Sequence, residues 1–483
     1  MERSEAASAG GAPVEAPARR SLVELLLRPR SIAIVGASTN PEALGGRPLG
    51  FLMSYGFPGA LYPINANHDT VQGVPAHRSI LDVDGPVDLA LVAVRAELVP
   101  QVLRDCARAG VGAAVVVSSG FGEGMGAGED LAEVVREIVA TTGMRILGPN
   151  CEGIASLPAS APVTFSPVLD IHRTGRRLAA GDIAVISQSG GVGFAVAQWG
   201  SMVGLGFGYI ITTGNELDVD CVELAEALVD DEHTSAIVLV MEGVSDLDRF
   251  RRLALRVRAA GKRLVVAKLG RSEPGTRGAL AHTRHASGPE AAYDAIFAES
   301  GVLTPRDMDE LIDVLQAIMK SPEPRGRRLG IMTTSGGAGV WLADACADAG
   351  YEIPELSAET TARLAGLMPG YGSPVNPVDL TAQFLADGSF AVPLAALVDS
   401  GEVDLAVLAT SLSSNGRLSG DREALAELIA RSPIPIAIYT YTSPAPSSVE
   451  ILNELGVPWY TDSFRAARGL SALIPGSDHV ERD

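Results

Sequence analysis

Two short glycine-rich segments of this chain are suited to hold a phosphoryl group. Ser189-Gly190-Gly191 and Ser335-Gly336-Gly337 each follow an apolar run and precede a helical pattern. A turn that opens a helix presents unpaired backbone N–H groups and the positive end of the helix dipole, so it binds an anion without a lysine. One such motif alone is more often only a tight turn, but two copies in one chain favour an anion site. If the two units pack face to face, both helix N-termini would converge on one phosphoryl group.

A third glycine-rich turn, Gly36-Ala37-Ser38, lies near the start of the chain and lacks the GxGxxG spacing of dinucleotide-binding proteins. The second apolar run ends at Asn65, where a nicotinamide cofactor would favour an acidic residue for its ribose hydroxyl. Both features argue against an NAD-dependent dehydrogenase. A nucleotide-like ligand that carries phosphate and adenine, such as coenzyme A, remains compatible with this turn.

Apolar runs that alternate with helical patterns must position these turns, and they predict an α/β fold with parallel sheets and ligands at the carboxyl ends of the strands. The second and third series of runs begin alike, with a strand, a Ser-Gly-Gly-x-Gly turn and a helix, which is an internal repeat. The sequence thus predicts a Rossmann-like domain followed by two flavodoxin-like domains. The predicted bounds are a disordered tail over residues 1–20 and domains over 21–158, 176–320 and 328–475. The predicted strands are residues 31–35, 60–64, 88–94, 113–118, 145–147, 182–186, 209–211, 236–240, 263–267, 329–333, 405–410, 434–439 and 457–460.

The composition fits several ordinary domains and excludes some partners. Of the 483 residues, 47% are hydrophobic and 20% charged, which is enough apolar mass for two to four cores. The net charge of −20 argues against nucleic acid, whose binding depends on cationic contacts to phosphate. The four cysteines show no metal-binding spacing, and no segment has the pattern of a membrane span or a signal peptide. We therefore expect a cytoplasmic protein.

Motifs spread over most of the chain carry a resemblance to a known family. From about Leu22 to about Ile474 the sequence is similar to nucleoside-diphosphate-forming acyl-CoA synthetases of the succinyl-CoA synthetase superfamily, and most closely to the α subunits of ADP-forming acetyl-CoA synthetases. The motifs that carry it are Gly36-Ala37-Ser38, Tyr62-Pro63-Ile64-Asn65, Gly85-Pro86-Val87-Asp88, Ser118-Ser119-Gly120-Phe121, Leu147-Gly148-Pro149-Asn150-Cys151, Ser187-Gln188-Ser189-Gly190, Thr213-Gly214-Asn215-Glu216, Glu242-Gly243, Ala281-His282-Thr283, Ser335-Gly336-Gly337 and Asn376-Pro377-Val378-Asp379.

The resemblance implies a reaction and a set of site residues. An acyl-CoA, phosphate and ADP would be interconverted with a carboxylic acid, coenzyme A and ATP through an acyl phosphate and a phosphohistidine. His282 would carry the phosphoryl group and Glu242 would orient its imidazole, which suits the chemistry because a carboxylate fixes the tautomer of a nucleophilic histidine. The implied phosphate-binding residues are Ser189, Gly190, Gly191, Ser335, Gly336 and Gly337. The implied coenzyme A-binding residues are Gly36, Ala37, Ser38, Asn65, Val94, Ser119, Gly120 and Asn150, and no metal ligand is implied.

The resemblance also implies a partner. Nothing in the sequence resembles the ATP-grasp module that binds nucleotide, so we expect a separate ATP-grasp β subunit that supplies ATP or ADP and Mg²⁺, in a homo- or hetero-oligomer.

Arg284 stands where the family usually has glycine, and Arg95 replaces a common proline. Two alternatives stay open: acyl transfer from coenzyme A without nucleotide, and a coenzyme A-binding regulatory protein. The sequence discloses neither the acyl group nor the preference for ADP or GDP.

Overall fold

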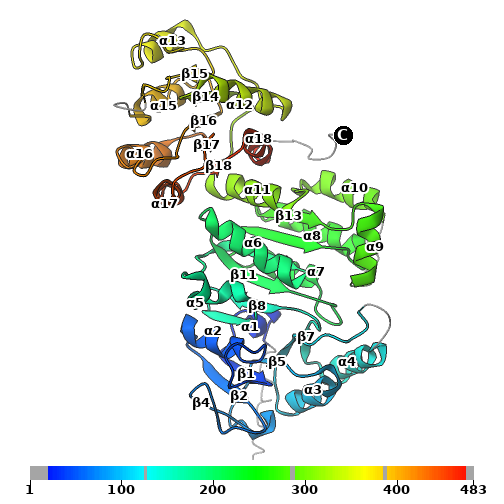
Figure 1. The fold of residues 1–483 in the computed structure, drawn as a ribbon. Helices are drawn as coiled ribbons and strands as arrows, with labels where there is room; N and C mark the ends of the chain where they lie inside the picture. Colours follow the sequence, from blue (N-terminus) through cyan, green and yellow to red (C-terminus); the bar gives the residue numbers. More distant parts are fainter. Residues whose placement is uncertain (1–19, 124–127, 283–288, 385–388, 475–483) are drawn as a thin grey trace, which may run out of the picture.

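The computed structural model describes residues 20–123, 128–282, 289–384 and 389–474, and the side chains of residues 280–282 are not among those described. Three largely parallel sheets follow one another along the long axis of the molecule, with helices packed against each (Figure 1). No helix in these ranges is long and apolar enough to cross a membrane. The α/β fold predicted from the sequence is confirmed.

The first domain is a parallel sheet of five strands in the order β2-β1-β5-β6-β7. Because β1 pairs with β2 on one side and with β5 on the other, the chain crosses over at β1, and the turn after β1 lies where α/β proteins bind ligands. Its elements are α1 (Leu22–Leu26), β1 (Ser31–Val35), α2 (Arg47–Tyr55), β2 (Ala60–Ile64), β3 (Thr70–Val71), β4 (Val74–Pro75), η1 (Ile80–Asp82), β5 (Leu89–Val92), η2 (Ala96–Leu98), α3 (Val99–Arg108), β6 (Ala113–Val116), α4 (Glu129–Thr142) and β7 (Arg145–Leu147).

The second domain has a six-stranded sheet in the order β13-β12-β10-β11-β8-β9. Four strands are parallel, and the hairpin of β8 and β9 adds an antiparallel edge beside β11. Its elements are β8 (Gly153–Ser156), β9 (Ala161–Thr164), η3 (Pro167–Leu169), α5 (Ile171–Thr174), β10 (Ala180–Ser187), α6 (Gly190–Met202), β11 (Phe207–Thr212), α7 (Cys221–Val229), β12 (Ala236–Met241), α8 (Leu247–Ala259), β13 (Arg263–Lys268), α9 (Glu273–His282), α10 (Glu290–Ser300) and α11 (Met308–Lys320).

The third domain is a parallel sheet in the order β15-β14-β16-β17-β18, so its first strand again lies between its second and third. This is the strand order of the first domain. Its elements are β14 (Leu329–Thr333), α12 (Gly336–Asp348), α13 (Ala358–Ala365), β15 (Val378–Asp379), α15 (Ala391–Val398), β16 (Leu405–Thr410), α16 (Arg422–Arg431), β17 (Ile436–Thr440), α17 (Pro446–Leu455), β18 (Trp459–Tyr460) and α18 (Ser463–Ser471).

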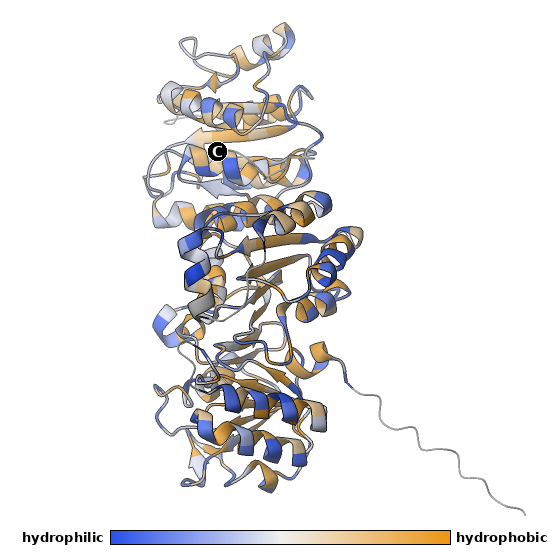
Figure 2. Ribbon diagram, turned by 90° about the vertical axis from the view of Figure 1, so that its right-hand side faces the viewer, coloured by the Kyte–Doolittle hydropathy of each residue, from blue (hydrophilic) through white to orange (hydrophobic). Residues whose placement is uncertain are grey.

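The central strands are buried on both faces, which explains why they read as continuous apolar runs rather than alternating ones. Figure 2 shows these strands in orange between helices that carry hydrophilic residues. The helices begin with ordinary capping residues, among them Asp220, Asp246 and Asp307, whose side chains accept backbone N–H groups of the first turn. The helix-capping residues and the apolar strands, both of which are local features of the sequence, are therefore consistent with the observed fold.

The second and third domains meet through α11 and α18, which pack against each other (Figure 1). Arg465 of α18 forms two hydrogen bonds with the buried carboxylate of Asp313 on α11, at 2.8 and 2.9 Å. The C-terminal end of α6 also contacts the third domain, because the Asn453 amide donates to the Met202 carbonyl over 3.2 Å. The N-terminal end of α6 points the other way, to the first domain.

Two predicted bounds differ from the structure. The first domain was expected to continue to residue 158, but β8 pairs with β11 and so belongs to the second sheet. An apolar run does not specify which sheet edge it joins, and we propose that the first domain ends near residue 152. Arg20, expected in the tail, is described and pairs with the Asp88 carboxylate. The rest of the predicted tail, residues 1–19, lies outside the described residues.

Candidate active site

The turn before α6 leaves its first backbone donors open. Ser189 is the N-cap residue, but its side chain makes no capping hydrogen bond. The Ser187 hydroxyl bonds with the backbone of Ser189 instead: it donates to the Ser189 carbonyl over 2.6 Å and accepts from the Ser189 N–H. A methyl group built on Gly191 would meet nothing within 4 Å. The first turn of α6 therefore faces open space with the donor groups that bind an anion.

This turn lines a cavity of about 350 Å³ between the first two domains. Ser119 and Asn150 of the first domain, expected to contact coenzyme A, line the same cavity as Ser189, Gly190 and Gly191, expected to contact phosphate. The structure thus brings together two predicted groups of residues that lie far apart in the sequence. The other lining residues are Val117, Cys151, Glu152, Phe165, Gln188 and Gly214.

A chain of hydrogen bonds fixes the first-domain wall of this cavity. The Ser119 hydroxyl donates to Asn150 over 2.7 Å, and the Asn150 amide donates to Asn215 of the second domain over 3.2 Å. Asn215 in turn donates to Glu123 over 2.6 Å, and the other oxygen of that carboxylate accepts the Gly120 N–H over 2.8 Å. Gly120 was expected to bind coenzyme A, but this N–H group is already paired with a carboxylate.

The turn after β1 is tightly packed and suits the close approach of a ligand. Gly36 has a φ of +91°, and a methyl group built on it would lie 2.4 Å from the Ala93 carbonyl oxygen, so only glycine fits. The Asn65 amide donates to the Ala37 carbonyl over 2.8 Å. Asn65 therefore helps to hold the Gly36–Ser38 turn in place, and its contact with coenzyme A stays a prediction.

A second cavity of about 510 Å³ extends the coenzyme A region of the first domain. Val94, Ser119 and Gly120 line it together with Arg95, the only basic residue in its described lining. Arg95 is accompanied in this lining by the Glu97 carboxylate, and a guanidinium group can pair with the phosphates of a nucleotide-like ligand. The residues of this region, with a glycine cradle and a cation, fit coenzyme A.

Glu242 lies where the sequence placed it, directly after β12, and it is buried. Its backbone N–H donates to the side-chain oxygen of Gln188 over 2.6 Å, while the Gln188 amide donates to the Gly243 carbonyl over 2.8 Å and to Glu216 over 3.0 Å. Gln188 was part of a quoted motif but was not expected to be functional. A functional role for Gln188 is indicated by its buried amide, which lies between two strand ends. Only the fold shows that this amide joins the backbone groups of Glu242 and Gly243.

Two further predicted features are the phosphohistidine candidate and the second Ser-Gly-Gly turn. His282 ends α9, and its side chain lies outside the described residues, as do Arg284 and His285. Ser335 stands at the N-cap position of α12 without a side-chain capping bond, as Ser189 does at α6, and the Thr333 hydroxyl bonds with the Ser335 backbone as Ser187 does with Ser189. The internal repeat is thus confirmed at the level of hydrogen bonds. None of the residues 335–337 lines the cavity at Ser189, and their phosphate-binding role stays a prediction.

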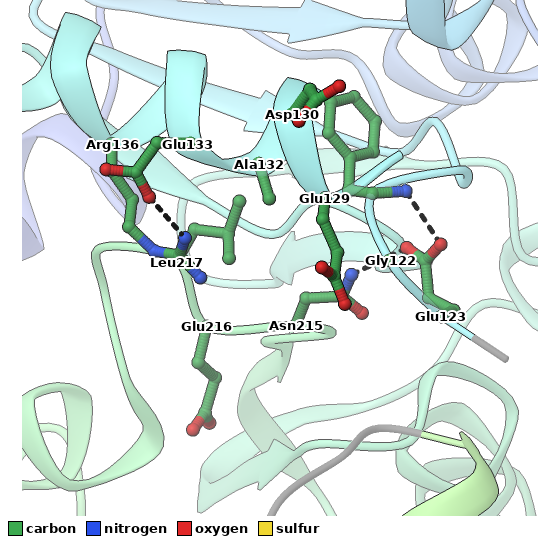
Figure 3. Close-up of a pocket in the computed structure, with 11 residues that line it drawn as sticks. Gly122, Glu123, Glu129, Asp130, Ala132, Glu133, Arg136, Asn215, Glu216 and Leu217 are labelled. Carbon is green, nitrogen blue, oxygen red and sulfur yellow. Dashed lines mark hydrogen bonds and ion pairs between the residues drawn. The ribbon is translucent and has the colours of Figure 1, made fainter. Parts of the chain in front are cut away.

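A third cavity, of about 600 Å³, is strongly acidic. Figure 3 shows Glu123, Glu129, Glu133 and Glu216 around it, with Arg136 paired to Glu133 at 3.1 Å. Carboxylates repel the phosphates of coenzyme A, so this cavity does not suit that ligand. In the described part of the chain, no group of three or more His, Cys, Asp or Glu side chains is arranged to hold a metal ion.

The fold and these cavities define a multidomain α/β protein of the CoA-ligase class. Three family descriptions match the chain in order: a CoA binding domain over residues 30–156, a succinyl-CoA ligase-like flavodoxin domain over residues 180–318 and a ligase-CoA domain over residues 329–388. The chain belongs to the family of ADP-forming acyl-CoA ligase α subunits, which confirms the resemblance found in the sequence.

Similar proteins cover nearly the whole chain. Acetate–CoA ligase [ADP-forming] I subunit alpha of Pyrococcus furiosus is 35% identical over 94% of this chain and 98% of its own length. 4-Hydroxybutyrate–CoA ligase [ADP-forming] of Nitrosopumilus maritimus is 30% identical over 94% of this chain and 64% of its own length. Acetyl-coenzyme A synthetase 1 of Ca. Korarchaeum cryptofilum, solved in complex with phosphate and ADP, has a TM-score of 0.83 with 32% identity and covers 93% of this chain and 96% of the solved chain.

Proposed function

We propose that this chain is the α subunit of an ADP-forming acyl-CoA synthetase, a ligase that interconverts acyl-CoA, phosphate and ADP with a carboxylic acid, coenzyme A and ATP. One observation carries the proposal: the open first turn of α6 shares a cavity with Ser119 and Asn150 of the coenzyme A-binding domain. A thioester and an anion are the two ligands that must meet for an acyl phosphate to form. The whole-length similarity to a subunit alpha supports the same function.

His282 is the proposed phosphoryl carrier. Its backbone ends α9, which follows β13, and β13 pairs with β12, the strand that leads directly to Glu242. Both residues thus follow neighbouring strands of one parallel sheet, whose carboxyl ends lie at the same edge. A buried carboxylate there would orient the imidazole and stabilise the cation formed on phosphorylation.

A separate ATP-grasp β subunit is proposed to supply ATP or ADP and Mg²⁺. The P. furiosus relative is named as one subunit of its enzyme, and this chain covers 98% of that subunit. We further propose a cytoplasmic location, which suits the four cysteines because all are buried free thiols. The acyl group stays open, since relatives are named for both acetate and 4-hydroxybutyrate.

The test is transfer of label from [γ-³²P]ATP to the purified chain with its β subunit and Mg²⁺. The wild type should acquire an acid-labile label that chases into ATP on addition of ADP, whereas His282→Ala should acquire none. His285→Ala is the matched control, three residues away, and should be labelled like the wild type. Equal labelling of His282→Ala and the wild type, or no label in a chain that still binds coenzyme A, would overturn the proposal.

A further inference from the structure

Glu152 places a carboxyl group inside the cavity that α6 shares with the first domain. It follows Cys151 directly, at the junction between the first domain and β8. A methyl group built on Gly190 would lie 2.9 Å from the Glu152 Cβ and 3.4 Å from its Oε2, so the side chain rests against the first turn of α6. Its backbone is held by two threonines, because Glu152 N donates to Thr212 over 2.9 Å and Thr164 donates to the Glu152 carbonyl over 2.5 Å.

The surroundings of the Glu152 carboxyl group favour its protonated form more than bulk water does. Burial raises the pKa of Glu152, and a hydrogen bond with Ser166 offsets part of that effect. No ion pair joins Glu152 to a cation within the ranges that the structure describes. A carboxylate whose pKa is raised by burial is a stronger base than an exposed one, so it accepts a proton more readily.

The neighbouring titratable side chains, Cys151 and Glu216, are less suited than Glu152 to exchange a proton in this cavity. Burial raises the pKa of the Cys151 thiol to about 12, and its Sγ donates to the Val116 carbonyl over 3.4 Å. Glu216 lies behind Gln188 and accepts hydrogen bonds from the Gln188 amide and the Thr213 hydroxyl. Among the described residues that line this cavity, Glu152 is thus the only carboxylic acid, and Cys151 is held as a thiol.

We propose that Glu152 is a further catalytic residue, which moves a proton between the coenzyme A thiol and the departing phosphate oxygen. In the direction of thioester formation, the Glu152 carboxylate accepts the S–H proton as sulfur attacks the acyl carbon of the acyl phosphate. The bond from the acyl carbon to the phosphate oxygen then breaks, and that oxygen takes the proton from Glu152. An acyl phosphate dianion and a thiol become a thioester and hydrogen phosphate, and Glu152 returns to the carboxylate.

The position of Glu152 supports this role because the proton must travel between the two groups that the cavity brings together. The coenzyme A side is marked by Ser119 and Asn150, and the phosphate side by the first turn of α6. Glu152 lies beside that turn and follows Asn150 by two residues. In the reverse direction the protonated form would donate to the departing thiolate, so the two directions require opposite states of one carboxyl group.

The inference rests on the proposed function, and two measurements on the complex of full chain and β subunit separate them. The first is labelling of His282 from [γ-³²P]ATP, which does not use coenzyme A. The second is thioester formation with the acid that the wild type converts fastest from a panel of acetate, 4-hydroxybutyrate and aryl acids. Absence of label in the wild type would refute the proposed function. A Glu152 variant that is labelled normally but forms thioester slowly would instead report on the role of Glu152.

Glu152→Gln keeps the size of the side chain and removes its titration. We expect normal labelling, a kcat for thioester formation reduced on the order of 100-fold or more, and a KM for coenzyme A within about threefold of the wild type. We also expect the wild-type kcat to decline at acidic pH and this decline to be absent in Glu152→Gln. Glu152→Asp, which also guards against misfolding of the first variant, should regain part of kcat. A wild-type kcat and pH profile in Glu152→Gln, or a change confined to KM, would overturn the inference.

Discussion

The backbone N–H of Glu242 donates a 2.6 Å hydrogen bond to the side-chain oxygen of Gln188, and this bond joins the ends of two neighbouring strands, β10 and β12. Gln188 also donates to Gly243, so one buried amide fixes both sides of the peptide that follows Glu242. The placement of the proposed histidine-orienting carboxylate therefore depends on a residue one position before the Ser-Gly-Gly turn. The proposed phosphate-binding turn and the residue that fixes the proposed histidine-orienting carboxylate are thus adjacent in the sequence.

Replacing Gln188 with leucine should disturb that carboxylate. The change leaves the Glu242 N–H and the Gly243 carbonyl without their buried partner, which costs about 1–3 kcal/mol of unfolding free energy. We expect a lower urea midpoint and labelling of His282 slowed about tenfold or more in the folded protein. Gln316→Leu is the control, because Gln316 is equally buried but accepts from Trp459 at the contact of the second and third domains. It should lose similar stability and keep normal labelling.

Gly36→Ala should impair coenzyme A binding. The added methyl group would meet the Ala93 carbonyl at 2.4 Å, so the turn after β1 must shift. Gly56→Ala is a matched control, because Gly56 also has a positive φ, +71°, but a methyl group there meets nothing within 4 Å. A thermal-shift titration with coenzyme A should show a clear rise in Tm for Gly56→Ala and little or none for Gly36→Ala. Equal shifts in the two variants would contradict the assigned site.

Ser189→Ala and Ser335→Ala form a second matched pair. Neither side chain caps its helix, so each substitution should change the unfolding free energy by less than about 0.5 kcal/mol. We expect Ser189→Ala to slow thioester formation from acyl phosphate about tenfold, since Ser189 lines the cavity, and Ser335→Ala to leave that step unchanged. Direct assay of acyl phosphate with coenzyme A tests this. A parallel loss in both variants would show that the third-domain turn acts in the same step.

The Asp88 carboxylate should make the free energy of unfolding depend on pH in the acidic range. Burial alone would raise its pKa, but hydrogen bonds from Arg30 and Arg20 outweigh it and lower the pKa to about 2. Because the folded pKa lies below the unfolded value of 3.8, the contribution is present above pH 4 and disappears as the pH falls toward 2. Asp88→Asn should cost about 1–2 kcal/mol at pH 7 and little near pH 2, as measured by urea unfolding. Asp84→Asn, at an exposed carboxylate, should cost little at either pH.

The fold was largely predictable because its signals are local. Buried parallel strands read as apolar runs, and β1, β2 and β14 have the predicted bounds. The Ser-Gly-Gly turns were also recognisable, since a helix start needs specific residue types. The pairing of β8 with β11 was not predictable, because an apolar run does not identify its neighbour in the sheet.

The site was predictable in part, for a different physical reason. Ser119, Asn150 and Ser189 were found from motifs, but their meeting in one cavity depends on how two domains pack. The engagement of the Gly120 N–H by Glu123 also depends on that contact, because Asn215 of the second domain holds the same carboxylate. Glu152 and Gln188 were passed over because a polar residue inside a motif reads as a turn or a cap until its surroundings are known.

Helix α6 reaches both neighbouring domains with its two ends. Its 13 residues span about 20 Å, from the cavity at Gly190 to the Met202 carbonyl that accepts a hydrogen bond from Asn453. One rigid element of the second domain therefore supplies open backbone donors to the cavity shared with the first domain and a carbonyl acceptor to the third domain.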